Sequence, residues 1–368
     1  MSIDLPVFRF DHDAGELASL CHAAERVIAS RRYVLGAEVA AFEEEFAAFC
    51  RTRHCVGVAN GTDALELALV ALGIRAGDRV ATVANAGHYT TTVLRAIGAA
   101  PVYVEVGDDL LMSVADLQRS LDDVRAVVVT HLYGRMAPID AILGLARQAG
   151  IPVVEDCAQA HGAERGGRMA GSFGDLGCFS FYPTKNLGAL GDGGAVVTSD
   201  EGLAATVRSL RQYGWSRKYC VEREGGRNSR LDEMQAAILR VKLPQLRRAN
   251  AARVAIACRY REGMHDLPAT IADWSAGEYV AHLFVVRCRD REALRARLAQ
   301  QSIGTDVHYP VPDHRQPTEI PRKHPPMPLT ESACREVLTL PCFPGMTDAD
   351  VDRVIDAIRH HYADGRDD

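Results

Sequence analysis

The stretch that decides the fold is Ile151-Pro152-Val153-Val154-Glu155-Asp156, an apolar run that leads directly into two acids. A short continuous apolar run predicts a buried strand of a parallel sheet, because helices cover both faces of such a strand. Ligands of open α/β sheets bind beyond the carboxyl ends of the strands. Glu155 and Asp156 are therefore expected at the edge where a site would form. The alternative is that Asp156 only caps the following turn.

The segments around this strand alternate between strand and helix from residue 55 to about residue 200. Such alternation predicts the α/β class, with a mostly parallel sheet covered by helices on both faces. Strands are expected at residues 55–58, 79–83, 102–106, 126–130, 152–155, 177–181 and 195–198, and helices at 62–72, 90–97, 114–121 and 138–148.

The pattern changes after a helical segment at residues 231–246. Further strands are expected at 278–287 and 305–309, further helices at 292–300 and 348–361, and a long loop in the proline-rich stretch that starts at Pro310. This change predicts a large domain over residues 1–246 and a smaller C-terminal α+β domain over 247–368. The N-terminal helix could pack on the small domain.

Composition limits the possible partners of the chain. It has 368 residues, a net charge of −6 and a pI near 6.1, which give no reason to expect nucleic acid. No apolar stretch approaches the length of a membrane span. The first residues lack the pattern of a signal peptide. Ten cysteines without a Cys-x-x-Cys pair predict reduced packing residues in the cytoplasm and no metal site.

Lys185 lies in Phe179-Ser180-Phe181-Tyr182-Pro183-Thr184-Lys185-Asn186, a polar break between two apolar strand-like runs. A lysine after a strand is usually a solvated loop charge. Burial would lower its pKa and make the neutral amine a nucleophile. Such an amine can hold a carbonyl cofactor as a Schiff base, and Asp156 can keep a pyridine nitrogen protonated. Together they meet the needs of pyridoxal phosphate.

Asn60-Gly61-Thr62 ends one predicted strand and opens a helix. Free backbone amides at a helix N-terminus attract a phosphate, and Thr62 adds a hydroxyl. An ordinary helix cap is the alternative. Asp63 should point away from a bound phosphate.

Many short motifs in one order resemble the DegT/StrS-type sugar aminotransferases, which are pyridoxal phosphate enzymes of fold type I. The likeness runs nearly end to end. The motifs are Tyr33-Val34-Leu35-Gly36, Asn60-Gly61-Thr62-Asp63-Ala64-Leu65, His131-Leu132-Tyr133-Gly134, Glu155 to Gly162, Phe179 to Gly194, Asn228 to Glu233, His308-Tyr309-Pro310 and Leu340-Pro341.

The resemblance implies roles for individual residues. Lys185 holds the cofactor and moves the proton, Asp156 pairs with the pyridine nitrogen, and Gln159 lies near the ring hydroxyl. The phosphate cup combines Gly61, Thr62 and Ser180 with Asn228 of the neighbouring subunit, which implies a homodimer with shared active sites. The family stacks an aromatic residue on the ring, but that position is Gly87 here. His88 is the favoured replacement and Tyr89 the alternative.

The resemblance also points to a substrate. The combination of Tyr182, His308 and Tyr309 resembles that of the family branch that aminates C3 of a dTDP-linked 3-keto-6-deoxyhexose. The resemblance implies L-glutamate as the amino donor. Arg217, Lys218 and Tyr219 could meet the pyrophosphate. A merely solvated basic loop is the alternative there.

Three rival functions stay open at this point. The same scaffold could aminate C4 of a 4-keto sugar, or a cyclitol. It could be a non-catalytic regulatory protein that keeps the cofactor pocket. The family also has a dehydratase branch in which histidine replaces the lysine, and Lys185 argues against that branch.

Overall fold

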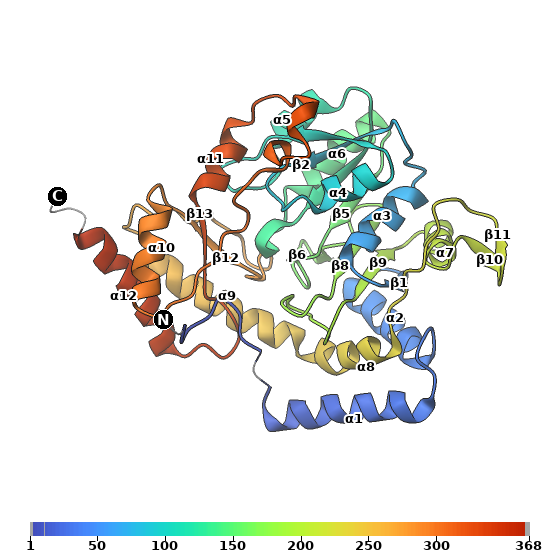
Figure 1. Cartoon of the computed structure of the whole chain (residues 1–368), viewed down its shortest axis with the longest axis horizontal. Helices are drawn as coiled ribbons and strands as arrows, with labels where there is room; N and C mark the ends of the chain where they lie inside the picture. Colours follow the sequence, from blue (N-terminus) through green and yellow to red (C-terminus); the bar gives the residue numbers. More distant parts are fainter. Residues whose placement is uncertain (1–2, 11, 365–368) are drawn as a thin grey trace.

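The computed structural model describes residues 3–10 and 12–364. Its centre is a seven-stranded sheet in the order β1-β9-β8-β5-β4-β2-β3 (Figure 1). The strands are β1 (His54–Val58), β2 (Arg79–Val83), β3 (Ala100–Val104), β4 (Val124–Thr130), β5 (Val153–Asp156), β8 (Leu176–Ser180) and β9 (Gly194–Thr198). β9 pairs antiparallel with β1 and β8, whereas the pairs β2-β3, β2-β4, β4-β5 and β5-β8 are parallel. The predicted mostly parallel mixed sheet is confirmed.

Helices cover both faces of this sheet (Figure 1). Alternate residues of β4 separate the two cores: Val127 and Val129 pack with α2 and α6 on one face, Ala126 and Val128 with α3 and α4 on the other. The helices are α2 (Ala37–Cys50), α3 (Gly61–Ala71), α4 (Tyr89–Ala96), α5 (Val114–Ser120), α6 (Ile139–Ala149), α7 (Glu201–Leu210) and α8 (Glu233–Lys242).

The C-terminal part builds a core of its own, in which Tyr260, Phe284 and Val354 are buried together with Leu5 from the N-terminus. Its elements are α9 (Leu246–Gly263), β12 (Phe284–Arg287), α10 (Arg291–Gln300), α11 (Pro328–Glu336), β13 (Val337–Leu340) and α12 (Asp348–Asp364). α9 begins at the expected boundary, and the division at residue 246 stays a prediction. α1 (Ala14–Ser30) packs on α8.

Two expected strands of this part differ from the structure. Only Phe284–Arg287 of the segment 278–287 is a strand. Residues 278–280 instead form backbone hydrogen bonds with residues 134–136, in the loop after β4. The strand predicted at 305–309 is wrong: one isolated bridge, Asp306 to Thr339, is present there. The His308 carbonyl accepts a side-chain hydrogen bond instead of a ladder bond.

Short elements complete the chain. The small strand pairs are β6 (Glu164–Arg165) with β7 (Arg168–Met169), and β10 (Trp215–Arg217) with β11 (Cys220–Val221). Single 3-10 turns are η1 (Leu132–Gly134), η2 (Leu243–Gln245), η3 (Asp313–Arg315) and η4 (Ile320–Arg322), the last two within the proline-rich stretch. No helix in the described part of the chain has the length and apolarity needed to cross a bilayer.

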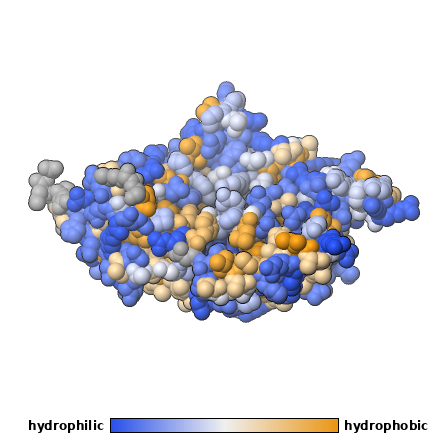
Figure 2. Space-filling model, turned by 60° about the horizontal axis from the view of Figure 1, so that its bottom comes forward, coloured by the Kyte–Doolittle hydropathy of each residue, from blue (hydrophilic) through white to orange (hydrophobic). Residues whose placement is uncertain are grey.

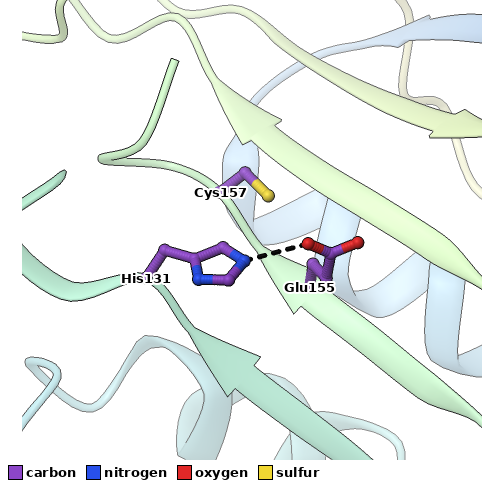
Figure 3. A group of neighbouring side chains, drawn as sticks. All are labelled: His131, Glu155 and Cys157. Carbon is purple, nitrogen blue, oxygen red and sulfur yellow. Dashed lines mark hydrogen bonds and ion pairs between the residues drawn. The ribbon is translucent and has the colours of Figure 1, made fainter. Parts of the chain in front are cut away.

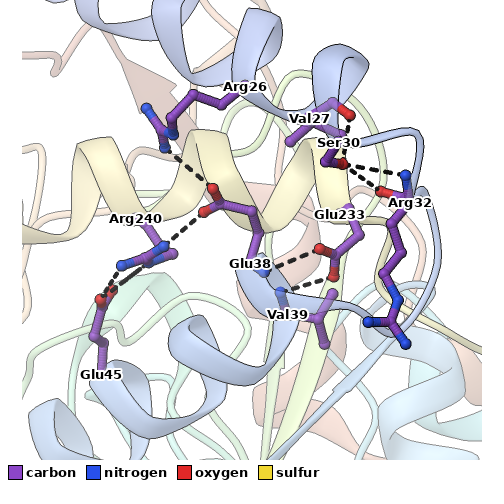
Figure 4. A network of polar contacts seen from close by, with 9 residues as sticks. All are labelled: Arg26, Val27, Ser30, Arg32, Glu38, Val39, Glu45, Glu233 and Arg240. Atoms are coloured by element: carbon purple, nitrogen blue, oxygen red, sulfur yellow. Dashed lines mark hydrogen bonds and ion pairs between the residues drawn. The ribbon is translucent and has the colours of Figure 1, made fainter.

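A polar network joins α1, α2 and α8 beneath the sheet (Figure 4). The N-cap of α2, Gly36, has no side chain to satisfy the first amides of the helix. The carboxylate of Glu233, on α8, replaces that cap by accepting the N–H groups of Gly36, Glu38 and Val39 at 2.7, 2.9 and 2.9 Å. A Cβ at position 36 would lie 2.6 Å from Glu233 Oε2, so this contact requires glycine.

We predict that Glu233→Ala lowers the free energy of unfolding by about 2–4 kcal/mol, because one buried and two half-buried amides lose a charged acceptor. The control is Glu45→Ala, which removes a side chain that is 40% exposed from its pair with Arg240. That exposed pair is worth less than about 1 kcal/mol. Equilibrium denaturant unfolding measures both losses, and equal losses would contradict the capping role.

Candidate functional site

The carboxyl ends of six strands that run in one direction meet at a single edge of the sheet. The segments that leave this edge carry the predicted site residues. β1 leads to Gly61 and Thr62, β2 to His88, β5 to Asp156 and Gln159, and β8 to Ser180 and Lys185. This placement follows from parallel strands, whose carboxyl ends must lie together.

Asp156 is the last residue of β5 and is buried, with 6% of its surface exposed. Its Oδ1 accepts the N–H of Ala158 at 3.1 Å, and its Oδ2 accepts the hydroxyl of Thr130 at 3.4 Å. Burial raises the pKa of Asp156, while the Ala158 amide and then the charge of Lys185 act against that rise. The carboxylate is thus short of strong donors and suits a cationic partner.

Lys185 lies five residues after the end of β8 and is half-buried. Burial lowers the pKa of Lys185 to about 8, and the nearby Asp156 acts in the opposite direction. No hydrogen bond of the Lys185 amine is formed within residues 3–10 and 12–364. The next residue, Asn186, is tied to Asn250 at 2.8 Å and to the Val280 carbonyl at 2.9 Å, which fixes the loop.

The predicted phosphate cup is assembled at the start of α3. Asn60 caps the helix by accepting the N–H of Asp63 at 2.8 Å, so the amides of Gly61 and Thr62 remain as first-turn donors. A Cβ at Gly61 would lie 2.6 Å from the Cβ of Ser180, which shows how closely the two segments approach. Arg227 pairs with Asp63 at 3.3 Å and draws that acid away from the cup.

His88 occupies the left-handed region, with φ 68°, at the N-cap of α4. Its N–H donates to Asp313 Oδ1 at 2.9 Å, and its Nδ1 bonds Thr92 Oγ1 at 2.9 Å. The remaining ring nitrogen, Nε2, is buried without a partner in the described part of the chain. The Thr91 hydroxyl donates to Asp313 Oδ2 at 2.6 Å, so one buried carboxylate holds the first turn of α4. Nothing in the proline-rich sequence signalled this role of Asp313.

Gln159 is held between two tyrosines. Its Oε1 accepts the Tyr133 N–H at 2.6 Å, and its Nε2 donates to the Tyr309 hydroxyl at 3.1 Å. The Tyr133 hydroxyl donates to the His308 carbonyl at 2.5 Å. The structure therefore brings His308 and Tyr309 of the C-terminal part to the sheet edge. Gly87 fits between Tyr89 and Tyr309, because a Cβ there would lie 2.9 Å from each ring.

Other predicted residues are not brought together within one chain. Arg217, Lys218 and Tyr219 belong to the exposed β10-β11 hairpin, which projects from one end of the molecule beside α7 (Figure 1). Tyr219 is 77% exposed. Tyr182 and Asn228 are also exposed. No hydrogen bond of the described residues links the Asn228 side chain to the cup of its own chain.

A buried cluster contains three side chains of types that can bind a metal ion: His131, Glu155 and Cys157 (Figure 3). His131 Nδ1 accepts the N–H of Ala137 at 3.0 Å, so Nε2 carries the proton and donates to Glu155 Oε2 at 2.9 Å. Glu155 also accepts the backbone N–H groups of residues 171, 173 and 174. Both histidine nitrogens are thus used, and the cluster braces the loops that lead to the site.

The residues at this edge fit pyridoxal phosphate. The cup offers amide donors to an anion, Asp156 offers a buried carboxylate to a ring nitrogen, and Lys185 offers an amine of lowered pKa. The unpartnered Nε2 of His88 and the partly exposed Lys185 leave polar atoms for a bound group. A mixed sheet with a lysine and an aspartate at its carboxyl edge defines a fold-type I pyridoxal phosphate enzyme.

Comparisons with known proteins agree with this class. The family described as the DegT/DnrJ/EryC1/StrS aminotransferase family matches residues 17–359. The dTDP-3-amino-3,4,6-trideoxy-alpha-D-glucose transaminase of Streptomyces venezuelae is 45% identical over 92% of this chain and 90% of that protein. The dTDP-3-amino-3,6-dideoxy-alpha-D-galactopyranose transaminase of Aneurinibacillus thermoaerophilus is 42% identical over 92% and 94%.

A solved structure shows the same arrangement. DesV of S. venezuelae, crystallised in complex with a ketimine intermediate, superposes with a TM-score of 0.93 at 42% identity and covers 98% of each chain. The chain belongs to the DegT/DnrJ/EryC1/StrS aminotransferase family.

We predict that the cofactor-free protein captures pyridoxal phosphate about tenfold faster at pH 7 than at pH 6, with a plateau above about pH 9, because only the neutral Lys185 amine reacts. The visible absorbance of the bound cofactor measures the rate. In Asp156→Asn the plateau should begin at lower pH, because the charge that raises the pKa of Lys185 is gone. A rate that still climbs toward pH 10 in the unaltered protein would contradict a buried amine.

Proposed function

We propose that this protein is a pyridoxal phosphate-dependent aminotransferase that transfers the amino group of L-glutamate to C3 of a dTDP-linked 3-keto-6-deoxyhexose. The observation that carries the proposal is that the half-buried Lys185 and the buried Asp156 act on each other's pKa at the carboxyl edge of the sheet. Three relatives that are more than 40% identical to the chain are transaminases of 3-amino sugars on dTDP. Another relative, at 41% identity, is named a sensory transduction protein of erythromycin biosynthesis. The C4 and regulatory alternatives are not favoured by the three transaminases.

Pyridoxal phosphate, when bound, supplies an electron sink for the bonds at the amino-bearing carbon. The protein supplies the rest. Asp156 keeps positive charge on the ring nitrogen, and its burial strengthens that interaction. The Lys185 amine, with a pKa of about 8, takes a proton from the substrate carbon at Nζ and returns it. Gly61, Thr62 and Ser180 hold the phosphate, while Gln159 and His88 position the ring.

A large cavity lies beside Lys185, between the N-terminal segment and α9, with a volume of about 740 Å³. Its lining includes Lys185 but not Thr62, Asp156 or Ser180, so this cavity does not by itself define the substrate space. Tyr182, His308 and Tyr309 offer hydroxyl and imidazole groups at or near the edge, and such groups can donate to or accept from sugar hydroxyls.

We propose a homodimer in which Asn228 and the basic hairpin serve the partner's site. In one chain the Arg217-Lys218-Tyr219 hairpin and Asn228 are exposed, and no hydrogen bond of the described residues links the Asn228 side chain to the cup. Large apolar side chains are also exposed, among them Leu17 and Ile28 of α1. Figure 2 shows apolar patches among polar ones on the face that brings the α1 side forward. A partner would cover such patches.

All ten cysteines are unpaired, which supports the cytoplasm as the place of action.

The test of the reaction is a direct competition between substrates. With L-glutamate, the dTDP-linked 3-keto-6-deoxyhexose should be aminated with kcat/KM at least about tenfold above that of the 4-keto isomer. Mass spectrometry of the products identifies the aminated carbon after fragmentation. Lys185→Ala should form no product. Preference for the 4-keto isomer would overturn the C3 assignment, and no product from any keto-sugar would overturn the aminotransferase itself.

The test of the shared site uses mixed dimers. Lys185→Ala and Asn228→Ala dimers should each be impaired, the second through weaker cofactor retention, because a charge-assisted hydrogen bond to the phosphate is lost. Mixing the subunits should restore activity, since one site of each mixed dimer then has both residues intact. If Asn228 served its own chain, every mixed site would remain defective and no activity would return.

A further inference from the structure

A second cavity lies on the other side of the C-terminal part, away from Lys185. Its volume is about 230 Å³. The loop that follows η1 contributes Arg135 and Met136, and the segment 273–278 of the C-terminal part closes the opposite wall. Backbone contacts fix both walls: the Met136 N–H donates to the Glu278 carbonyl at 2.8 Å, and Arg135 forms a β-bridge with Tyr279. None of these lining residues has a place in the proposed transamination.

Arg135 is the unusual residue of this cavity. Only 6% of its surface is exposed, and Nη1 is fully buried without a hydrogen-bond partner in the described part of the chain. Two other arginines are buried to this degree. Arg211 donates to Glu43 Oε1 at 2.5 Å, and Arg253 donates to the Cys342 carbonyl at 2.5 Å. Arg135 alone among the three has no such bond within residues 3–10 and 12–364.

The acids around the cavity do not neutralise Arg135. The two carboxylate oxygens of Glu278 are occupied by Arg165, at 2.8 and 2.7 Å. Asp273 pairs with Arg261 at 3.1 Å. Asp109 is exposed and accepts the N–H of Leu111 at 3.1 Å, and it forms no ion pair among the described residues. An unpaired buried guanidinium is costly, so its charge calls for an anion in the cavity.

The lining defines the class of that anion. A guanidinium binds a carboxylate through two parallel N–H···O bonds. The remaining wall has an apolar part, formed by Leu111, Met136, Pro138 and Trp274, and a polar part, formed by Asp109, Arg165, Asp273, Ser275 and Glu278. One unpaired positive charge matches a single carboxylate, and the second negative charge of a dianion such as phosphate would add to the repulsion by Asp109 and Glu278.

We propose that this cavity is a binding site for a small monocarboxylate with an apolar body, anchored on Arg135. Burial lowers the pKa of Arg135, and a bound carboxylate would reverse this effect. Because the two walls come from the sheet loop and from the C-terminal part, the ligand would also stabilise the contact between them.

The probe is sodium butyrate, with neutral butyramide as its matched control, at constant ionic strength. Calorimetry and thermal unfolding are measured on the full chain loaded with pyridoxal phosphate. Butyrate should bind and raise Tm, whereas butyramide should not. Arg135→Met should weaken butyrate binding at least about tenfold, since the hydrogen bonds to the charged group are lost. Arg125→Met removes an exposed arginine, 70% exposed, and should bind butyrate as the unaltered protein does.

A second variant guards against misfolding of Arg135→Met. Ser275 is an exposed lining residue, so Ser275→Glu adds a competing carboxylate without disturbing the core and should also abolish butyrate binding. Unchanged affinity in both variants would overturn the site. Equal responses to butyrate and butyramide would overturn the role of charge. Binding of inorganic phosphate in the absence of butyrate binding would overturn the monocarboxylate class.

Discussion

The site depends on the burial of two opposite charges at the end of neighbouring strands. β5 places Asp156 in the interior, and β8 leads to Lys185 in the loop beyond it. Burial disfavours the charged form of each group, and each partly restores the charge of the other. The balance leaves a carboxylate that can pair with a cation and an amine whose pKa of about 8 gives it a reactive neutral fraction near physiological pH. A more exposed loop would leave Lys185 with a much smaller neutral fraction.

The reversal of one strand makes this balance possible. β9 runs against its neighbours, so the chain returns from the Lys185 loop, residues 181–193, directly into the sheet beside β8. The remaining strands end at the same edge, which gathers Gly61, His88 and Asp156 from distant parts of the sequence. Glu155 and His131 brace this edge from within, because Glu155 binds three loop amides as well as the imidazole.

The C-terminal part contributes residues to the site. Its long proline-rich segment returns to the sheet, where the Asp313 carboxylate holds His88 and Thr91. Tyr309 reaches Gln159, and the His308 carbonyl receives the Tyr133 hydroxyl. Both parts of the chain therefore hold the residues that are expected around the cofactor ring. The Arg135 cavity is formed by another contact between the same two parts, on a different surface.

The sequence by itself determined the α/β class, most strands of the sheet and the family, because apolar periodicity and local motifs are properties of neighbouring residues. It also predicted Lys185 and Asp156 as partners, since their motifs end strands of one parallel sheet. It did not predict the anchoring role of Asp313, the fixing of Asn186 or the cap that Glu233 provides for α2. These contacts join residues far apart in the chain, as with Asp313 and His88. The expected strand at 305–309 failed for the same reason: its backbone and side chains are used by distant partners, which only the packing of the two parts decides.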